Sequence, residues 1–253
     1  MNDLTGKSAI VTGGSRGIGL AIAAALVARG VNVLATGRRE ERLAKARELL
    51  ASGSSAKPGD GADETGAARG RLETLVADVR DQEPVRRAVK TAVERFGGLD
   101  ILINNAGLGI FRNVADLTLD QWRETIETNL TGVFNFCHAA IPELRRRGGG
   151  WIINISSLAG KNSFPGAAAY CASKAGLNAF SEALMQEVRY DGIRVSYVMP
   201  GSVDTEFSGD SGTGGGWKRA AADVAAIVVD LLDHHPRSLP SRVEIRPSQP
   251  KKG

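Results

Sequence analysis

Cysteine, histidine and long apolar runs are scarce in this sequence, and each scarcity excludes a class of protein. The two cysteines, Cys137 and Cys171, are too few for a disulfide framework and are typical of a reducing compartment. No apolar run reaches the length of a membrane-spanning helix, and residues 1–8 are polar, so we expect neither a membrane anchor nor a signal peptide. The three histidines show no metal-ligand spacing, so we expect no metal site.

The charged residues form no concentrated basic surface that would bind a nucleic acid. The formal net charge is +4 and the isoelectric point is about 9.2, but lysine and arginine are scattered along the chain. A length of 253 residues with 42% hydrophobic residues suits one α/β domain with a substantial core. We therefore expect a soluble cytoplasmic protein of one domain, over residues 1–253, that binds a small molecule and neither a nucleic acid nor a membrane.

Glycines are concentrated in residues 12–19, Thr-Gly-Gly-Ser-Arg-Gly-Ile-Gly, which follow a short apolar run and precede a helical pattern. In this context the glycines permit a tight turn and let backbone N–H groups approach a pyrophosphate at a helix N-terminus. The stretch lacks the Gly-Lys-Ser/Thr ending of a P-loop, which excludes that class of nucleotide site. It therefore predicts a dinucleotide site.

Apolar runs and helical patterns alternate along the chain. We expect strands at residues 9–11, 31–36, 74–77, 101–103, 151–155, 193–198 and 242–245. We expect helices at residues 20–27, 40–50, 82–96, 119–144, 170–190 and 221–233, the longest of them interrupted near Pro142. This alternation predicts βαβ units, so the expected fold class is α/β: a single-domain, doubly wound parallel sheet (Rossmann fold) with helices on both faces.

Three segments lack the periodicity of a helix or a strand. Residues 51–71 are rich in Gly, Ser, Ala and Asp, a composition more typical of a mobile surface insertion than of a functional flap. Residues 206–218 contain five glycines and follow the sixth predicted strand. We predict a substrate lid there, with an idle surface loop as the alternative. Residues 247–253 are expected to form a tail.

Tyr170 and Lys174 are candidates for acid–base chemistry because they are four residues apart in a helical pattern and so project from one face. An ammonium close to a phenol favours the phenolate and lowers a pKa that starts near 10. A tyrosine with such a pKa can donate or accept a proton near neutral pH. Alone, this spacing also occurs on many helices as an exposed surface pair.

Several short motifs accompany this pair in a fixed order. They are Thr12-Gly13, Gly17-Ile18-Gly19, Asp78-Val79, Asn104-Asn105-Ala106-Gly107, Asn129, Ser157, Tyr170-x-x-x-Lys174 and Pro200-Gly201. In order and spacing the set resembles the short-chain dehydrogenase/reductase family from about residue 4 to about residue 205. The resemblance implies an oxidoreductase that interconverts carbonyl compounds and alcohols with a nicotinamide cofactor.

The resemblance also implies roles for individual residues. Tyr170 would be the general acid in reduction, Lys174 would lower its pKa and bind the nicotinamide ribose, and Ser157, which fits the family spacing better than Ser156, would hold the substrate oxygen. Asn129 would hold a water that relays protons between Lys174 and solvent. The expected cofactor-binding residues are Gly13, Ser15, Arg16, Gly17, Ile18, Gly19, Gly37, Arg38, Arg39, Asp78, Val79, Asn105, Ala106, Gly107, Tyr170, Lys174, Pro200, Gly201, Val203 and Thr205.

Apolar side chains near the same edge of the predicted sheet indicate a mainly apolar substrate. The expected substrate-binding residues are Ser157, Leu158, Phe164, Tyr170, Phe207 and Trp217.

The cofactor is expected to be NADP(H), because the second predicted strand ends in Thr36-Gly37-Arg38-Arg39, without the carboxylate that holds an adenosine ribose 2′-OH in NAD sites. Arg38 can bind a 2′-phosphate bidentately, and Arg16 in the glycine-rich turn is a second cation. Arg39 either points outward or stacks on adenine. Family members with basic residues at the positions of Arg16 and Arg38 are typically NADP-dependent, which agrees with the electrostatic argument.

The predicted function is an NADP(H)-dependent oxidoreductase, acting as a ketone or 3-oxoacyl reductase. The alternative is a redox-silent regulatory protein that binds NADP on the same fold. The intact set of four catalytic candidates argues against that alternative, since a sensor needs no proton relay.

The helix that carries Tyr170 has one side of small residues, namely Ala172, Ala175, Gly176 and Ala179. They allow either close packing on the sheet or association with a second copy, and the resemblance favours a homodimer or homotetramer. The C-terminus lacks the glycine-rich segment with which many family members end, so the choice between dimer and tetramer stays open.

Overall fold

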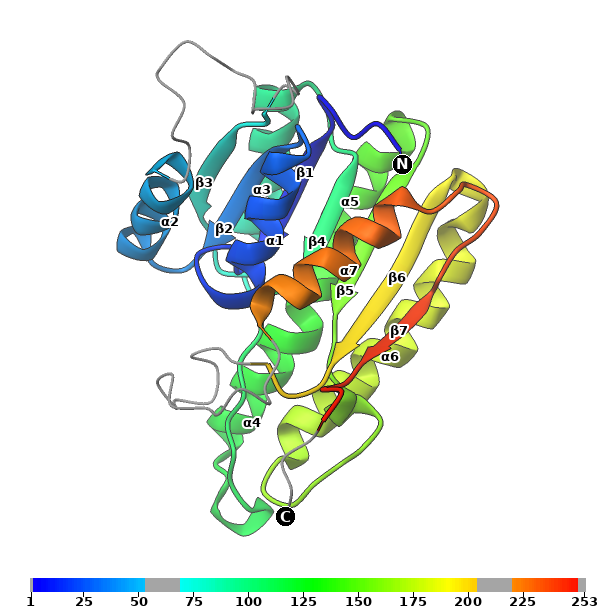
Figure 1. Cartoon of the computed structure of the whole chain (residues 1–253). Helices are drawn as coiled ribbons and strands as arrows, with labels where there is room; N and C mark the ends of the chain where they lie inside the picture. Colours follow the sequence, from blue (N-terminus) through cyan, green and yellow to red (C-terminus); the bar gives the residue numbers. More distant parts are fainter. Residues whose placement is uncertain (1, 53–68, 204–219, 250–253) are drawn as a thin grey trace.

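A seven-stranded parallel sheet forms the centre of the molecule (Figure 1). The computed structural model describes residues 2–52, 69–203 and 220–249. The strand order is β3-β2-β1-β4-β5-β6-β7. The strands are β1 Ser8–Thr12, β2 Asn32–Gly37, β3 Leu72–Val76, β4 Ile101–Asn104, β5 Gly150–Ile155, β6 Ile193–Pro200 and β7 Arg242–Ile245. The order reverses between β1 and β4, and a doubly wound sheet binds its ligands at such a point.

Helices cover both faces of the sheet, which confirms the predicted fold class (Figure 1). One face carries α1 and α7, and the other carries α3, α5 and α6. A further helix, α2, packs beside β2 and β3. The helices are α1 Gly17–Ala28, α2 Glu40–Ser52, α3 Gln82–Phe96, α4 Leu119–Ile126, α5 Gly132–Arg146, α6 Ala168–Val188 and α7 Ala221–Asp233.

The strands supply side chains alternately to two hydrophobic cores. Val11 and Ile103 lie in the core under α1 and α7, whereas their neighbours Ile10 and Leu102 lie in the core under α3, α5 and α6. Burial on both faces explains why these strands are continuous apolar runs in the sequence. It also fixes the register of the sheet, because a slip by one residue would exchange the two sets.

The predicted helix at residues 119–144 is interrupted, but not at Pro142. After α4 the chain passes through a π-helical turn, Glu127–Thr131, and α5 then runs through Pro142 to Arg146. The side chain of Pro142 is exposed, so its ring disturbs no packed neighbour on the sheet side. The π-helical turn accommodates an extra residue in the helical hydrogen-bonding pattern. The Asn129 side chain in this turn forms hydrogen bonds with the backbone of Leu108.

The predicted surface insertion falls mostly outside the described residues. Residues 53–68 of this segment, 206–218 of the predicted lid and 250–253 of the tail cannot be compared with the structure. Of the insertion's described residues, Ala51 and Ser52 belong to α2, so the predicted insertion begins two residues too early, and the Gly70 N–H donates to the Val27 carbonyl at 2.9 Å.

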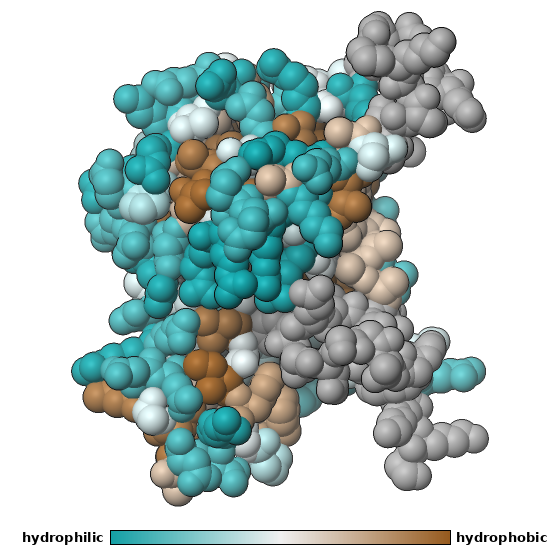
Figure 2. Space-filling view, turned by 90° about the vertical axis from the view of Figure 1, so that its left-hand side faces the viewer, coloured by the Kyte–Doolittle hydropathy of each residue, from teal (hydrophilic) through white to brown (hydrophobic). Residues whose placement is uncertain are grey.

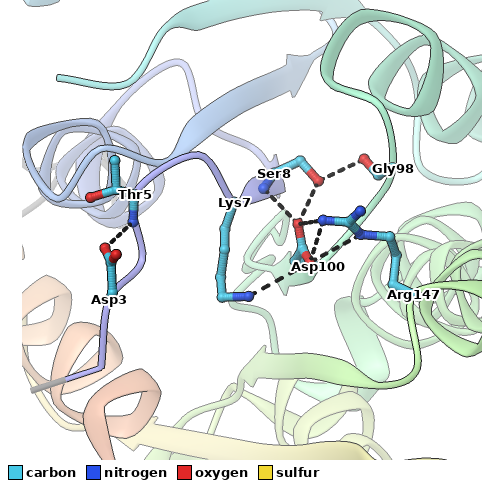
Figure 3. Close-up of polar contacts among 7 residues, drawn as sticks. All are labelled: Asp3, Thr5, Lys7, Ser8, Gly98, Asp100 and Arg147. Carbon is cyan, nitrogen blue, oxygen red and sulfur yellow. Dashed lines mark hydrogen bonds and ion pairs between the residues drawn. The ribbon is translucent and has the colours of Figure 1, made fainter. Parts of the chain in front are cut away.

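A buried carboxylate, Asp100, connects the amino-terminal ends of the central strands (Figure 3). It accepts hydrogen bonds from the Ser8 N–H at 2.9 Å and from Arg147 Nη2 at 3.1 Å, and Lys7 Nζ lies 3.8 Å away. The Ser8 hydroxyl also donates to the Gly98 carbonyl at 2.6 Å. The cluster joins β1, β4 and the segment before β5 at the edge opposite the strand C-termini. This arrangement therefore has a structural role.

The surface on the side of α2 is mainly hydrophilic (Figure 2). Among the residues that the structure describes, every helix is too short or too polar to cross a membrane.

Candidate functional site

A cavity of about 1010 Å³ opens at the carboxyl ends of the strands. Its wall includes the following predicted residues: Gly13, Ser15, Arg16, Gly17, Ile18, Gly37, Arg38, Arg39, Asp78, Val79, Asn105, Ala106, Gly107, Ser157, Leu158, Phe164, Tyr170, Lys174, Pro200, Gly201 and Val203. Two predicted residues, Gly19 and Asn129, do not line it. Three others, Thr205, Phe207 and Trp217, lie outside the described residues.

The glycine-rich turn forms one end of the cavity and requires its glycines for backbone reasons. Gly13 and Gly17 have φ angles of 65° and 53°, which other residues rarely adopt. A Cβ at Gly19 would overlap the Gly13 carbonyl oxygen, so Gly19 lets α1 pack against the turn instead of facing a ligand. The first N–H groups of α1 lie at the cavity, where a helix N-terminus favours an anion.

Hydrogen bonds hold the turn against the loop after β4. Thr12 Oγ1 accepts from the backbone N–H groups of Asn105 and Ala106 at 2.9 and 3.0 Å. The Asn105 amide donates back to the carbonyl oxygens of Thr12 at 2.9 Å and Gly13 at 3.3 Å. The Asn105 side chain therefore maintains the shape of the cavity in addition to lining it.

Arginines surround the same end of the cavity. Besides Arg16, Arg38 and Arg39, the wall includes Arg42, which the sequence analysis missed. Its position in the first turn of α2, three residues after Arg39, was the available signal. Arg38 Nη1 also lies 3.6 Å from Glu124 Oε1 on α4, so this guanidinium already has one carboxylate neighbour.

Asp78, another predicted residue of this end, is paired with Arg80 at 2.7 Å. Burial raises the pKa of the Asp78 carboxyl, but the hydrogen bonds from Arg80 outweigh burial, so the net pKa lies below its ordinary value. Asp78 is therefore ionised at neutral pH, and its charge is balanced by Arg80.

Tyr170 and Lys174 lie one helical turn apart on α6 and face the cavity together with Ser157. Lys174 Nζ is 5.9 Å from the centre of the Tyr170 ring and donates to the Ile155 carbonyl at 2.8 Å. Ser157 follows β5, and its Oγ accepts from the Ala159 N–H at 3.1 Å. The neighbouring Ser156 instead donates its hydroxyl hydrogen to Asn178 Oδ1 at 2.6 Å. The two serines that the sequence analysis compared therefore have different hydrogen-bond partners.

The pKa values of the pair differ from the prediction. Burial raises the pKa of the Tyr170 phenol, and a hydrogen bond with Ser157 lowers it by less. Burial also lowers the pKa of the Lys174 ammonium to about 8. The expected net lowering of the tyrosine pKa by Lys174 is therefore wrong for this structure, because desolvation exceeds the favourable interactions of the phenolate.

Asn129 is fully buried in the π-helical turn. Its Oδ1 accepts from the Leu108 N–H at 2.8 Å, and its Nδ2 donates to the Leu108 carbonyl at 2.8 Å and to Ser173 Oγ at 3.0 Å. The side chain therefore links the turn to the loop beyond Gly107 and to α6. Its role in a proton relay stays a prediction.

Aromatic side chains form the wall beside Tyr170. The Phe111 ring lies 5.7 Å from the Tyr170 ring in an edge-to-face arrangement and 6.2 Å from the Phe164 ring in a stacked one. The sequence analysis predicted Phe164 but not Phe111. The other wall residues that it did not include among its site residues are Leu108, Thr128, Ile155, Ser156, Ala159, Asn162, Ser202, Arg246 and Pro247, with Ala77 at the arginine end.

No group of three or more histidine, cysteine, aspartate or glutamate side chains in the described part of the chain could hold a metal ion. The described wall of the cavity offers a phenol, an ammonium and a hydroxyl beside a glycine-rich turn.

Comparisons with known proteins agree with this geometry. The short chain dehydrogenase family model matches residues 7–214. An uncharacterized oxidoreductase of Staphylococcus saprophyticus is 33% identical over 247 residues, which cover 98% of this chain and 100% of that protein. The 3-oxoacyl-[acyl-carrier-protein] reductase FabG of Chlamydia muridarum is 36% identical over 205 residues, which cover 81% of this chain and 77% of that protein.

Solved structures give the same result. A short chain dehydrogenase of Burkholderia cenocepacia in complex with NADP has a TM-score of 0.83 and 34% sequence identity, and the match covers 97% of this chain and 98% of that chain. Because the family model and a relative of full length both match, this chain belongs to the short-chain dehydrogenase/reductase family and is an oxidoreductase.

Proposed function

We propose that this protein is an NADP(H)-dependent reductase of ketones or 3-oxoacyl compounds, which also oxidises the corresponding secondary alcohols. The observation that carries the proposal is that Ser157, Tyr170 and Lys174 share one cavity with the glycine-rich turn. A cavity of about 1010 Å³ is large enough for a dinucleotide and part of a substrate. The similarity to a 3-oxoacyl reductase supports the substrate class.

The residues present fit a nicotinamide dinucleotide. The glycine-rich turn packs closely on the loop after β4, since a Cβ at Gly13 would lie 2.9 Å from the Ala106 Cα, and the first N–H groups of α1 lie at the cavity, where they would bind the pyrophosphate. Arg16 and Arg38 would hold the 2′-phosphate that distinguishes NADP from NAD. The NADP complex of the Burkholderia relative supports this choice.

The chain contributes the acid and the contacts that orient the substrate. When bound, the reduced nicotinamide supplies a hydride to the carbonyl carbon. Tyr170 donates its phenolic proton to the carbonyl oxygen, so hydride and proton together convert C=O into CH–OH. Ser157 donates a hydrogen bond to the same oxygen. The raised pKa of Tyr170 keeps the phenol protonated before the transfer, and Lys174, with a pKa of about 8, is charged near neutral pH and stabilises the phenolate afterwards.

The test is the loss of NADPH absorbance with a panel of ketones and 3-oxoacyl thioesters. We expect turnover by the wild type and a loss of about a hundred- to ten-thousandfold in Tyr170→Phe, with cofactor binding retained. Tyr190→Phe is the matched control, because Tyr190 is exposed at the far end of α6. Retention of most activity by Tyr170→Phe would refute the mechanism. Cofactor binding without turnover of any carbonyl compound would favour the redox-silent regulatory protein.

We also propose that the protein is a cytoplasmic, single-domain homodimer or homotetramer. On α6, Ala172, Ala175 and Ala179 are exposed and do not pack on the sheet. Trp122, on the helix α4 that packs against α6, and Phe134 on α5 are also exposed. A second copy related by a two-fold axis would cover such a surface.

A further inference from the structure

Two phenylalanine side chains from different loops lie beside Tyr170 on the cavity wall. Phe111 belongs to the segment between β4 and α4, and Phe164 to the segment between β5 and α6. The centre of the Phe111 ring is 5.7 Å from that of Tyr170, with the ring planes 64° apart, and 6.2 Å from that of Phe164, with the planes 28° apart. Both distances are typical of favourable aromatic pairs, so the three rings form one aromatic cluster around the proposed acid.

Hydrogen bonds connect both loops to the parts of the chain that carry the catalytic candidates. The Phe164 carbonyl accepts from the N–H of Ala167, a buried residue directly before α6. In the other loop, the Asn129 side chain binds both the N–H and the carbonyl of Leu108, three residues before Phe111, at 2.8 Å each. A ligand beside Tyr170 would therefore meet two loops that already have backbone support, which reduces the ordering that binding requires.

The aromatic cluster leaves apolar surface that a substrate can cover. Phe111 is 38% exposed and Phe164 is 48% exposed, although phenylalanine is among the residues most often buried. Leu158, directly after Ser157, adds an aliphatic side chain to the same cavity wall. Covering such surface with an apolar group is favourable. An aryl group gains more than an alkyl group, because an aromatic ring can also place its positive edge against the face of a phenylalanine.

We propose that Phe111 and Phe164 bind an aromatic ring of the substrate, and that the protein therefore prefers ketones with an aryl group to aliphatic ketones of the same size. The aryl ring packs on the two phenylalanines while the carbonyl oxygen contacts Tyr170 and Ser157. This inference rests on the proposed carbonyl reduction at Tyr170, and it narrows the predicted substrate class from apolar ketones to aryl ketones.

The test compares benzylacetone with the same ketone carrying a cyclohexyl ring in place of the phenyl ring. The saturated spacer keeps the intrinsic reactivity of the two carbonyl groups nearly equal, so the ratio of the two kcat/KM values reports the contribution of the aromatic ring. We expect the wild type to prefer benzylacetone, although the cyclohexyl ring is the more hydrophobic. Phe111→Leu should lower the ratio by about fivefold, and Phe164→Leu should lower it too. Phe134→Leu is the matched control, since Phe134 is an exposed phenylalanine on α5 outside the described cavity wall.

Two results would overturn the inference. A wild type that prefers the cyclohexyl ketone would show that the site selects only for hydrophobicity. Equal losses of kcat/KM for the two ketones in Phe111→Leu would show that Phe111 only supports Tyr170. If the wild type reduces neither ketone, the proposed function fails, and calorimetry with benzylacetone in the presence of NADPH still decides: weaker binding by Phe111→Leu than by Phe134→Leu supports the aromatic site, and equal or undetectable binding refutes it.

Discussion

Replacing Lys174 by methionine should stabilise the folded protein at neutral pH while it removes activity. Lys174 is 4% exposed, and burial lowers the pKa of its ammonium from 10.5 to about 8. The folded state therefore holds a charged group that water would solvate better. Methionine has a similar length and flexibility but no charge, so the variant removes this cost with little change in packing.

The size of the effect follows from the pKa difference. A fall from 10.5 to about 8 corresponds to roughly 3 kcal/mol of unfavourable free energy for the charged form, at about 1.4 kcal/mol per pKa unit. The variant also loses the hydrogen bond from Nζ to the Ile155 carbonyl, which costs about 1 kcal/mol. The free energy of unfolding at pH 7 should therefore rise by about 2 kcal/mol in Lys174→Met.

The pH dependence of the stability difference distinguishes the cost of burying the Lys174 charge from a simple change in packing. Between pH 8 and 10.5 the unfolded chain binds more protons at Lys174 than the folded chain, so the stability of the wild type increases with pH in that window. Above about pH 10.5 Lys174 is neutral in both states, so the wild type no longer bears the cost of a buried charge. This gain in stability is lost as the pH falls through about 8. The advantage of the variant should therefore disappear at high pH.

Urea unfolding of both proteins at a series of pH values measures the difference, with Lys90→Met as the control because Lys90 is largely exposed. A Lys174→Met protein that is less stable than the wild type at pH 7, or whose difference is independent of pH, would refute the reasoning.

Three further predictions test other parts of the molecule. Arg38→Ala should raise KM for NADPH by about ten- to a hundredfold and change that for NADH little; an unchanged ratio of the two catalytic efficiencies would contradict the assignment of NADP(H). Asp100→Asn should lower the free energy of unfolding by about 3 kcal/mol, because it removes a buried carboxylate with its pairs, and leave kcat unchanged, because the cluster lies at the opposite edge of the sheet. If α6 forms the proposed two-fold interface, Ala175→Arg should lower the sedimentation coefficient to that of a folded monomer, since Ala175 is exposed on α6; an unchanged sedimentation coefficient would contradict the proposed interface.

Some residues of the site could be identified from the sequence, and others only from the folded structure. The sequence analysis identified the glycine-rich turn, Ser157, Tyr170 and Lys174, because each has a fixed spacing within a local motif. It did not anticipate Phe111 or Arg246, which come to the cavity through long-range packing of a loop and through the pairing of β7 with β6. It also predicted that Gly19 binds the cofactor and that Asn129 relays protons; the structure adds that a Cβ at Gly19 would overlap the Gly13 carbonyl oxygen and that the Asn129 side chain forms hydrogen bonds with Leu108 and Ser173.

The sequence by itself determined the order of strands and helices and the fold class, because hydrophobic periodicity and glycine positions act over a few residues. It also determined which groups stand at the carboxyl ends of the strands, since a parallel sheet brings all those ends to one edge. Only the tertiary structure decided the protonation of the Tyr170–Lys174 pair. Spacing along a helix shows that two side chains are neighbours, but their pKa values depend on how far the surrounding chain excludes water, and that burial is made by segments distant in sequence.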